Sequence, residues 1–159
     1  EIQIGDREYE NEAFAEELIR KHRRFINRRL RILESRAEHA AAAGEQAQRP
    51  LRRSEAIKIL QPLFLQLTRE MELPLWTLTV RDARTRWGSC SHQTRRVMLN
   101  LQAARLPVPL QRYLIVHELA HIQHLGHGDA FWDLVARFDP EYKTNRRVLR
   151  EEYGWLLAN

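Results

Sequence analysis

Apolar residues recur at helical spacing through the first part of the chain. Over residues 12–43 an apolar stripe and an alanine-rich end predict one long helix, which Gly44 would terminate. Residues 44–53 have little apolar content and predict a linker. The helix expected over residues 54–71 starts at a serine, a preferred N-cap residue, and Pro62 within it predicts a kink or an earlier restart.

In the middle of the chain, the pattern of apolar and polar residues changes to a period of two. Residues 76–80 alternate between the two faces of a strand and are rich in β-favouring side chains. Residues 85–90 and 96–100 have the same character, and the polar stretch 91–95 between them predicts a hairpin. A small, mainly antiparallel sheet is therefore expected.

Helical spacing returns after the sheet. Two prolines precede a helix expected over about residues 110–124, and Gly126 is placed to end it. Residues 129–138 predict a short helix and residues 141–157 a final one. The order of elements predicts an α+β fold, with a small sheet between helices.

The length of 159 residues predicts one domain over residues 1–159, in which 1–53 form an N-terminal helical part with a linker and 54–159 a core. No stretch reaches the roughly 18 apolar residues that a membrane span requires. The single cysteine, Cys90, excludes an intrachain disulfide, and the first residues do not resemble a signal peptide. These features predict a cytoplasmic protein.

The net charge is +5, and the basic residues are concentrated in one block. Residues 20–36 contain eight lysines and arginines against the single acid Glu34. Such a block is either the solvated face of a helix or a contact for a polyanion such as nucleic acid.

The strongest chemical signal is the sequence His117-Glu118-Leu119-Ala120-His121 within a predicted helix. Side chains four positions apart share a helix face, so both imidazoles can converge on one Zn²⁺ ion. Glu118 lies about 100° round the axis, where its carboxylate can act as general base toward a zinc-activated water. The alternative is a pair of hydrogen-bonded core histidines beside a surface acid.

A catalytic zinc site needs a third protein ligand. His127 follows a predicted chain reversal at Gly126, which can swing its imidazole back toward the metal. His124 is the competitor, but it stands about 10 Å along the helix axis from the first ligand. A distant acid, Glu141 or Glu151, is the third option. The spacing favours His127.

Several short motifs occur together in a fixed order, and as a set they resemble the YgjP-like metallopeptidase domain, a bacterial family of zincin-like proteins. The likeness spans roughly residues 55–150. The motifs are Arg84-Thr85-Arg86-Trp87-Gly88-Ser89-Cys90, Leu99-Asn100, His117-Glu118-Leu119-Ala120-His121, Gly126-His127-Gly128-Asp129 and Phe131-Trp132.

The resemblance implies a zincin-like fold with an active-site helix beside a small sheet. It also implies zinc bound by His117, His121 and His127, with Glu118 as the catalytic acid and base. One departure is visible, because the family usually shows Asn-His-Ser where this chain has Gly-His-Gly around His127. The histidine is kept, and the rigidity of the turn is what differs.

Four residues near the predicted sheet are proposed to bind substrate: Arg86, Trp87, Gly88 and Asn100. In zincin-like folds an edge strand beside the metal helix binds an extended peptide, and a glycine lets another backbone approach closely. The alternatives are a core role for Trp87 and a β-bulge at Gly88. Cys90 is predicted to be a small buried residue instead of a nucleophile.

The residues therefore predict a zinc-dependent hydrolase, most simply a metallopeptidase that cleaves extended peptide segments. The same chemistry also hydrolyses phosphoanhydrides, so a metal-dependent nucleotide hydrolase is the alternative, supported by the arginines of the chain. A nucleic-acid-associated zincin is a second alternative, in which the basic segment 20–36 contacts phosphates.

Overall fold

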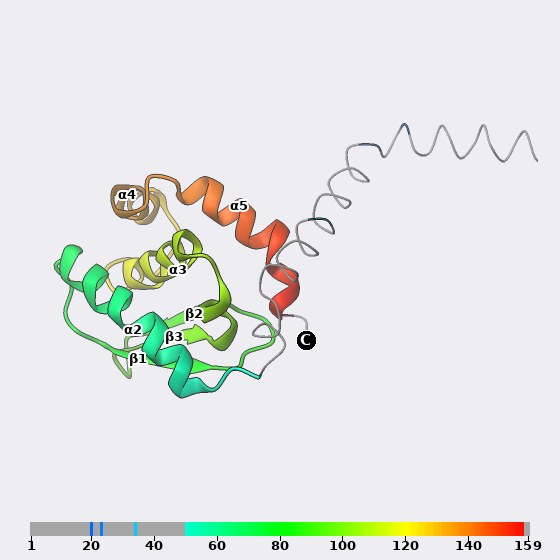
Figure 1. The fold of residues 1–159 in the computed structure, drawn as a ribbon. Coiled ribbons are helices and arrows are strands. Elements are labelled where there is room, and N and C mark those ends of the chain that lie inside the picture. Colours follow the sequence, from blue (N-terminus) through cyan, green and yellow to red (C-terminus); the bar gives the residue numbers. More distant parts are fainter. Residues whose placement is uncertain (1–19, 21–22, 24–33, 35–49, 158–159) are drawn as a thin grey trace, which may run out of the picture. The chain divides into compact units, whose positions relative to one another are not determined.

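The computed structural model describes residues 50–157 together with Arg20, Arg23 and Glu34, which are helical and exposed. The chain divides into two units, Glu1–Ala43 and Gly44–Asn159, and every element below lies in the second (Figure 1). Apart from those three positions, the helix expected over residues 12–43 lies outside the described residues, as does most of the linker. The expectation of one domain over residues 1–159 stays a prediction.

The first helix of the second unit, α2, spans Arg53–Glu70 and is continuous through the exposed Pro62. Its N-cap is Arg52, two residues before the serine that the sequence favoured, because the Glu55 carboxylate accepts a hydrogen bond from the Arg52 backbone N–H at 3.0 Å. One face of α2 is buried against the sheet and neighbouring helices, through Ala56, Leu60, Phe64, Leu67 and Thr68.

The sheet has three strands, β1 (Thr77–Arg81), β2 (Gly88–Ser91) and β3 (Arg96–Asn100), in the order β1-β3-β2. The predicted hairpin is present, since β2 and β3 pair antiparallel. However, β1 pairs with β3 in parallel, so the expectation of a mainly antiparallel sheet is corrected to a mixed one. The chain passes from β1 to the far edge before it turns back, which leaves the central position to β3.

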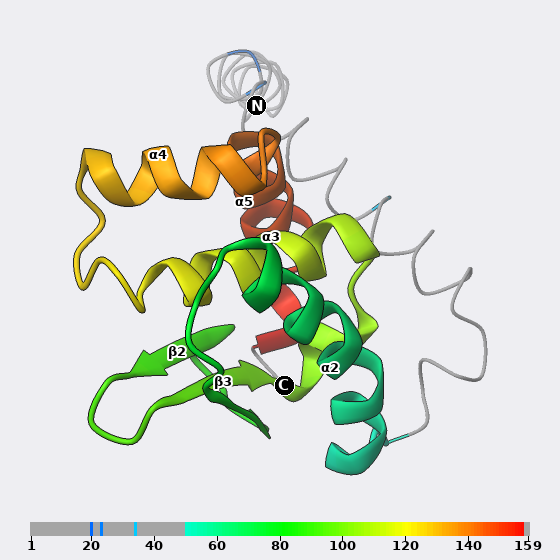
Figure 2. The same cartoon turned by 90° about the vertical axis from the view of Figure 1, so that its left-hand side faces the viewer.

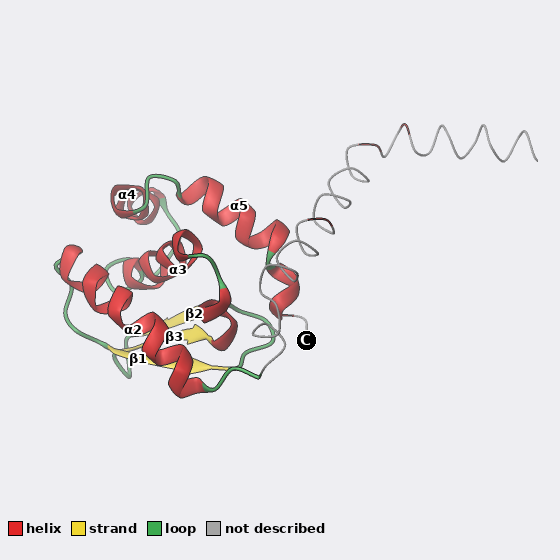
Figure 3. Ribbon diagram, viewed as in Figure 1, coloured by secondary structure: helices red, strands yellow, loops and turns green. Residues whose placement is uncertain are grey.

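Helix α3 (Val108–Ala120) is the central element, since it contacts β2, β3 and the helices α2, α4 (Asp129–Phe138) and α5 (Tyr142–Glu152). Figures 2 and 3 show it between the sheet and the α4–α5 pair. The short 3₁₀ helices η1 (Leu101–Arg105) and η2 (Gly154–Leu157) complete the described fold. None of the described helices combines the length and the apolar character needed to cross a membrane.

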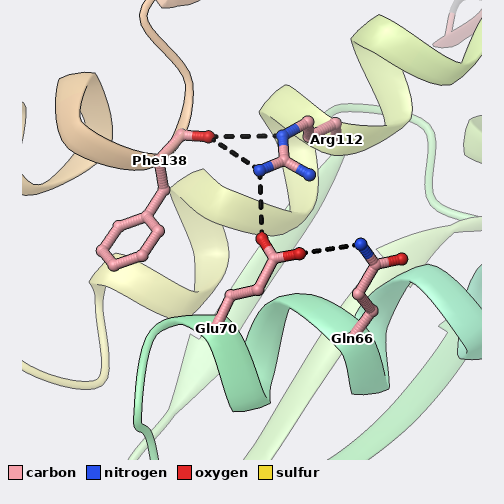
Figure 4. A network of polar contacts seen from close by, with 4 residues as sticks. All are labelled: Gln66, Glu70, Arg112 and Phe138. Carbon is pink, nitrogen blue, oxygen red and sulfur yellow. Dashed lines mark hydrogen bonds and ion pairs between the residues drawn. The ribbon is translucent and has the colours of Figure 1, made fainter.

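Arg112 of α3 links three helices (Figure 4). Its guanidinium donates two hydrogen bonds, of 3.2 and 3.1 Å, to the carbonyl oxygen of Phe138 at the end of α4. It also forms an ion pair of 3.1 Å with Glu70 of α2, whose other carboxylate oxygen accepts from Gln66. This network satisfies a carbonyl that the helix end leaves unpaired, and it fixes α3 between its neighbours.

Candidate metal centre

Three imidazoles from α3, its C-cap and the following loop lie together beside the end of that helix. His117 is on α3, His121 is its C-cap residue and His127 lies in the loop before α4. Each offers one nitrogen, and the three nitrogens lie within 4.8 Å of one another. The Nε2 atoms of His117 and His127 are 3.1 Å apart. Two nitrogens bound tetrahedrally to one zinc ion would be about 3.3 Å apart, so the donor set fits that metal.

The other ring nitrogen of His121 is fixed by the backbone. Its Nδ1 lies 2.9 Å from the carbonyl oxygen of His124, which can only accept, so Nδ1 donates this hydrogen bond and Nε2 is the nitrogen left to bind a metal. The helix ends at Ala120, four residues earlier than predicted, and this early end brings the His124 carbonyl within reach. His124 thus acts through its main chain, and its imidazole is outside the cluster.

Burial favours the neutral form of His117 and His127, which is the form that binds metals. Burial lowers the pKa of His117 to about 3, with further lowering by His121, His127 and the Arg146 charge. The pKa of His127 is also lowered, by burial first and then by His121 and Arg146. The buried Nδ1 of His117 has no hydrogen-bond partner among the described residues.

Aromatic rings support the imidazoles from the side of α4. The Phe131 ring lies 5.0, 4.6 and 4.7 Å from the ring centroids of His117, His121 and His127. Trp132 lies 5.9 and 5.7 Å from the first and last of these rings. These two aromatic residues, which form the last of the motifs quoted for the family resemblance, make up one wall of the cluster.

Glu118 lies beside the cluster and is almost completely buried between α3 and β2, with 6% of its surface exposed. Burial raises the pKa of its carboxyl to about 8 from the ordinary 4.5, and the charge of Arg86 opposes this shift. Gly88 makes the space, since a Cβ atom at that position would lie 2.5 Å from a Glu118 carboxylate oxygen. The Glu118 carboxylate thus occupies the space beside Gly88 on this face of β2, and the close approach of a substrate backbone at Gly88 stays a prediction.

Strand β2 runs alongside α3. It begins with Gly88 against Glu118, and the turn after it places His92 Nε2 2.7 Å from the His121 carbonyl oxygen, to which it donates a hydrogen bond. As an edge strand, β2 pairs with β3 alone among the described strands. Its second edge is therefore open next to the three imidazoles.

Cys90 lies in the middle of β2 and is half-buried. Burial, together with the nearby Glu118 charge, raises the pKa of its thiol to about 11. A thiol in this state is a poor nucleophile at neutral pH, which agrees with its predicted role as a small packing residue.

The remaining predicted substrate residues occupy the loop before β2 and the end of β3. Asn100 is fully buried and donates from Nδ2 to the carbonyl oxygens of Ala83 and Arg86, at 2.5 and 3.0 Å. Its Oδ1 accepts from the Gln102 backbone N–H at 2.9 Å. Asn100 thus holds the loop in place, and Trp87 packs partly on the core. Substrate contact by either residue stays a prediction.

Two residues near the cluster escaped the sequence prediction. Tyr113 lies one helical turn before His117, with ring centroids 5.9 Å apart, and burial raises its pKa to about 12. The four-residue spacing could have revealed it. Arg146 of α5 lies over the Trp132 ring at 4.8 Å, and its charge lowers the pKa of His117 and His127. Nothing in the sequence distinguishes this arginine from the other basic residues of its helix, so its position beside the cluster could not be predicted.

Comparison with known proteins agrees with this geometry. The model of the YgjP-like metallopeptidase domain matches residues 2–152. The structure is similar to the metallopeptidase zymogen jannalysin of Methanocaldococcus jannaschii, with a TM-score of 0.54 and 17% identity over 59% of this chain and 96% of that one. The zymogen abylysin of Pyrococcus abyssi gives a TM-score of 0.53 and 20% identity over 57% and 92%.

At these identities the structural likeness concerns the fold, which this chain shares with the two metallopeptidase zymogens. No curated protein matches the sequence. The family match covers most of the chain and includes the imidazole cluster, Glu118 and the edge strand. The chain therefore belongs to the YgjP-like metallopeptidase domain family and is a metallohydrolase.

Proposed function

We propose that the chain is a zinc metallopeptidase that hydrolyses extended peptide segments. The observation that carries the proposal is the convergence of His117, His121 and His127 beside the buried Glu118. Three neutral imidazoles with one further position open to water are the donor set of catalytic zinc sites. In this proposal the three histidines hold the ion and Glu118 is the catalytic acid and base.

When bound, zinc would lower the pKa of a water molecule to about 7 and polarise the scissile carbonyl. The protein's own contribution is proton transfer and positioning. Glu118 accepts one proton from the attacking water and delivers it to the departing amine nitrogen as the C–N bond breaks and the new C–O bond forms. Arg86 favours the ionised form of Glu118 that the first transfer requires, against the effect of burial.

The open edge of β2 supports an extended peptide as substrate. A peptide backbone that pairs with an exposed strand gains main-chain hydrogen bonds independently of its sequence. Because Gly88 contacts Glu118 and the turn after β2 contacts the His121 carbonyl, a peptide on this edge would run past the metal ligands. The hydrogen bond from His92 would keep strand and helix in register.

Two measurements on the purified protein test this function: bound zinc and turnover, each for wild type and Glu118→Gln. Near-stoichiometric zinc is expected in both, and cleavage of a diverse peptide library only in wild type. A panel of nucleoside triphosphates provides the comparison. Turnover of nucleotides that depends on Glu118, without cleavage of any peptide, would contradict the peptidase proposal and assign the site to the phosphoanhydride alternative.

A matched pair of variants tests the third ligand. His127→Ala removes an imidazole of the cluster, and zinc content is expected to fall well below one per chain. His124→Ala keeps the backbone carbonyl that orients His121, so its zinc content should remain near that of wild type. Loss of zinc in His124→Ala with retention in His127→Ala would contradict the proposed ligand set.

The nucleic-acid alternative depends on the basic segment 20–36, of which the structure describes Arg20 and Arg23 as helical and exposed, along with Glu34. Salt-dependent DNA binding that is lost on neutralising Arg23 and its neighbouring arginines would support it.

A further inference from the structure

The face of the sheet that points away from α3 is hollowed. A depression of about 500 Å³ lies over all three strands, and strands and connecting loops form its entire lining. Thr79 and Arg81 come from β1, while Arg96 and Met98 come from β3. Neighbouring positions on these strands, Val80, Val97 and Leu99, are buried on the opposite face, as the alternation of a strand requires.

The hollow is strongly basic. Arg81, Arg86 and Arg96 line it against the single acid Asp82. All three arginines are exposed, and their side chains form no ion pair or hydrogen bond within the part of the chain that the structure describes. Like charges gathered in a concave surface reinforce one another's field, so the hollow attracts anions.

The hollow is continuous with the edge at which the proposed substrate binds. Along β2, Gly88 and Cys90 face α3, while Ser89 and Ser91 line the hollow. A peptide paired with β2 would follow the same alternation. Every second side chain of that peptide would point toward the metal helix, and the others toward the basic side of the sheet.

We propose that this basic hollow, formed by Arg81, Arg86 and Arg96, is a specificity site for acidic side chains of a peptide bound along β2. The proposal rests on the peptidase function proposed above and names its substrate class. An aspartate or glutamate at alternate positions of the peptide gains charge-assisted hydrogen bonds to the arginines and hydroxyls of the hollow. A lysine at the same positions meets like charge.

The lining favours a peptide over a single-stranded nucleic acid. Proteins that bind single strands provide aromatic side chains on which bases stack, and the hollow is lined by none. Its serines, Ser89 and Ser91, instead offer hydroxyl donors beside the guanidinium groups, which suits carboxylates carried on a short strand, whereas the hydroxyls of Thr79 and Thr94 donate to Val97 and Ser91.

Three fluorogenic peptides of equal length test the proposal, with glutamate, alanine or lysine at every second position. For the zinc-loaded wild type, kcat/KM is expected to be about tenfold higher for the glutamate peptide than for the alanine peptide, and lowest for the lysine peptide. The preference should weaken as salt rises, because the arginines are exposed. Equal kcat/KM for the three peptides would overturn the proposal while leaving the peptidase function intact.

Variants of the arginines test whether the preference for the glutamate peptide arises in the hollow. Arg81→Gln/Arg96→Gln should bring the glutamate-to-alanine ratio close to one, whereas Arg53→Gln/Lys58→Gln, which removes the same charge from exposed positions of α2, should keep the wild-type ratio. The charge reversal Arg81→Glu/Arg96→Glu should favour the lysine peptide. An unchanged ratio in both hollow variants would overturn the proposal.

Two further results separate this inference from the function on which it rests. Failure of the wild type to cleave even the alanine peptide would refute the peptidase function itself, and the substrate class with it. Salt-dependent binding of single-stranded DNA that is lost in Arg81→Gln/Arg96→Gln but kept in Arg53→Gln/Lys58→Gln would assign the hollow to phosphates and overturn the acidic-peptide proposal.

Discussion

Glu118 can occupy its position only because Gly88 has no Cβ atom. The carboxylate fills the place where any other residue would carry its Cβ, at distances of 2.5 to 2.7 Å from three Glu118 atoms. Neither partner can give way easily, because one is strand backbone and the other is buried between α3 and β2. The pair therefore sets how far the carboxylate stands from the three imidazoles.

Gly88→Ala is expected to displace the Glu118 carboxylate and reduce kcat by about 100-fold, since general acid–base catalysis contributes at least that much. Zinc content should stay at the wild-type level, because the imidazoles are untouched. Steady-state kinetics and metal analysis on the same preparation check both statements. Gly154→Ala is the control, since a Cβ there meets nothing within 4 Å. Wild-type kcat in Gly88→Ala would show that the carboxylate accommodates the methyl group.

At the scale of elements, the loop between β1 and β2 decides where the edge strand lies. Asn100 ends β3 and binds this loop through two donated hydrogen bonds, while its own backbone N–H donates to the Trp87 carbonyl oxygen at 2.7 Å. The loop carries Arg86, which lines the hollow and whose charge lowers the pKa of Glu118. Asn100 thus contributes to the site as a positioning residue.

Asn100→Ala should lower the free energy of unfolding by about 2–3 kcal/mol, because it leaves the carbonyls of Ala83 and Arg86 without their donor. Urea denaturation of the metal-free protein measures the change. Gln93→Ala, in the exposed hairpin turn, is the comparison and should stay within about 0.5 kcal/mol of wild type. A similar stability for Asn100→Ala and wild type would mean that water replaces the lost amide.

The elements show which features the sequence could predict. Helical spacing predicted that His117 and His121 share one face of α3, and Gly126 with His127 predicted a return of the chain, because both are local properties. The parallel pairing of β1 was not predictable in this way, since alternation identifies a strand but not its neighbour. Likewise, Arg146 reaches the site through the packing of α5 on α3, which no short-range pattern records.

For the whole molecule, two buried groups make the stability of the metal-free protein depend on pH in opposite directions. The pKa of Glu118 is about 8 in the folded state against an ordinary 4.5, so the folded state holds the extra proton between these values and stability falls as pH rises. The pKa of His117 is about 3 against 6.5, so between those values the unfolded state holds the extra proton and stability rises with pH.

Above pH 6.5 only the effect of Glu118 remains, so the metal-free wild type is expected to lose stability between pH 6.5 and 8. Glu118→Gln cannot ionise and should show a much smaller loss over the same range. Urea unfolding in the presence of a chelator, at both pH values, gives the comparison. Equal losses in the two proteins would mean that Glu118 is already ionised at pH 6.5 without metal.

The hydrogen bond between His121 and the main-chain carbonyl of His124 has a consequence for how this fold evolves. A group supplied by the peptide backbone survives almost any exchange of the side chain attached to it. Position 124 is therefore free to drift among relatives that keep the same early helix end. An alignment would display that drift as neutrality, although the main chain at this position would still orient the His121 ring wherever the hydrogen bond is kept.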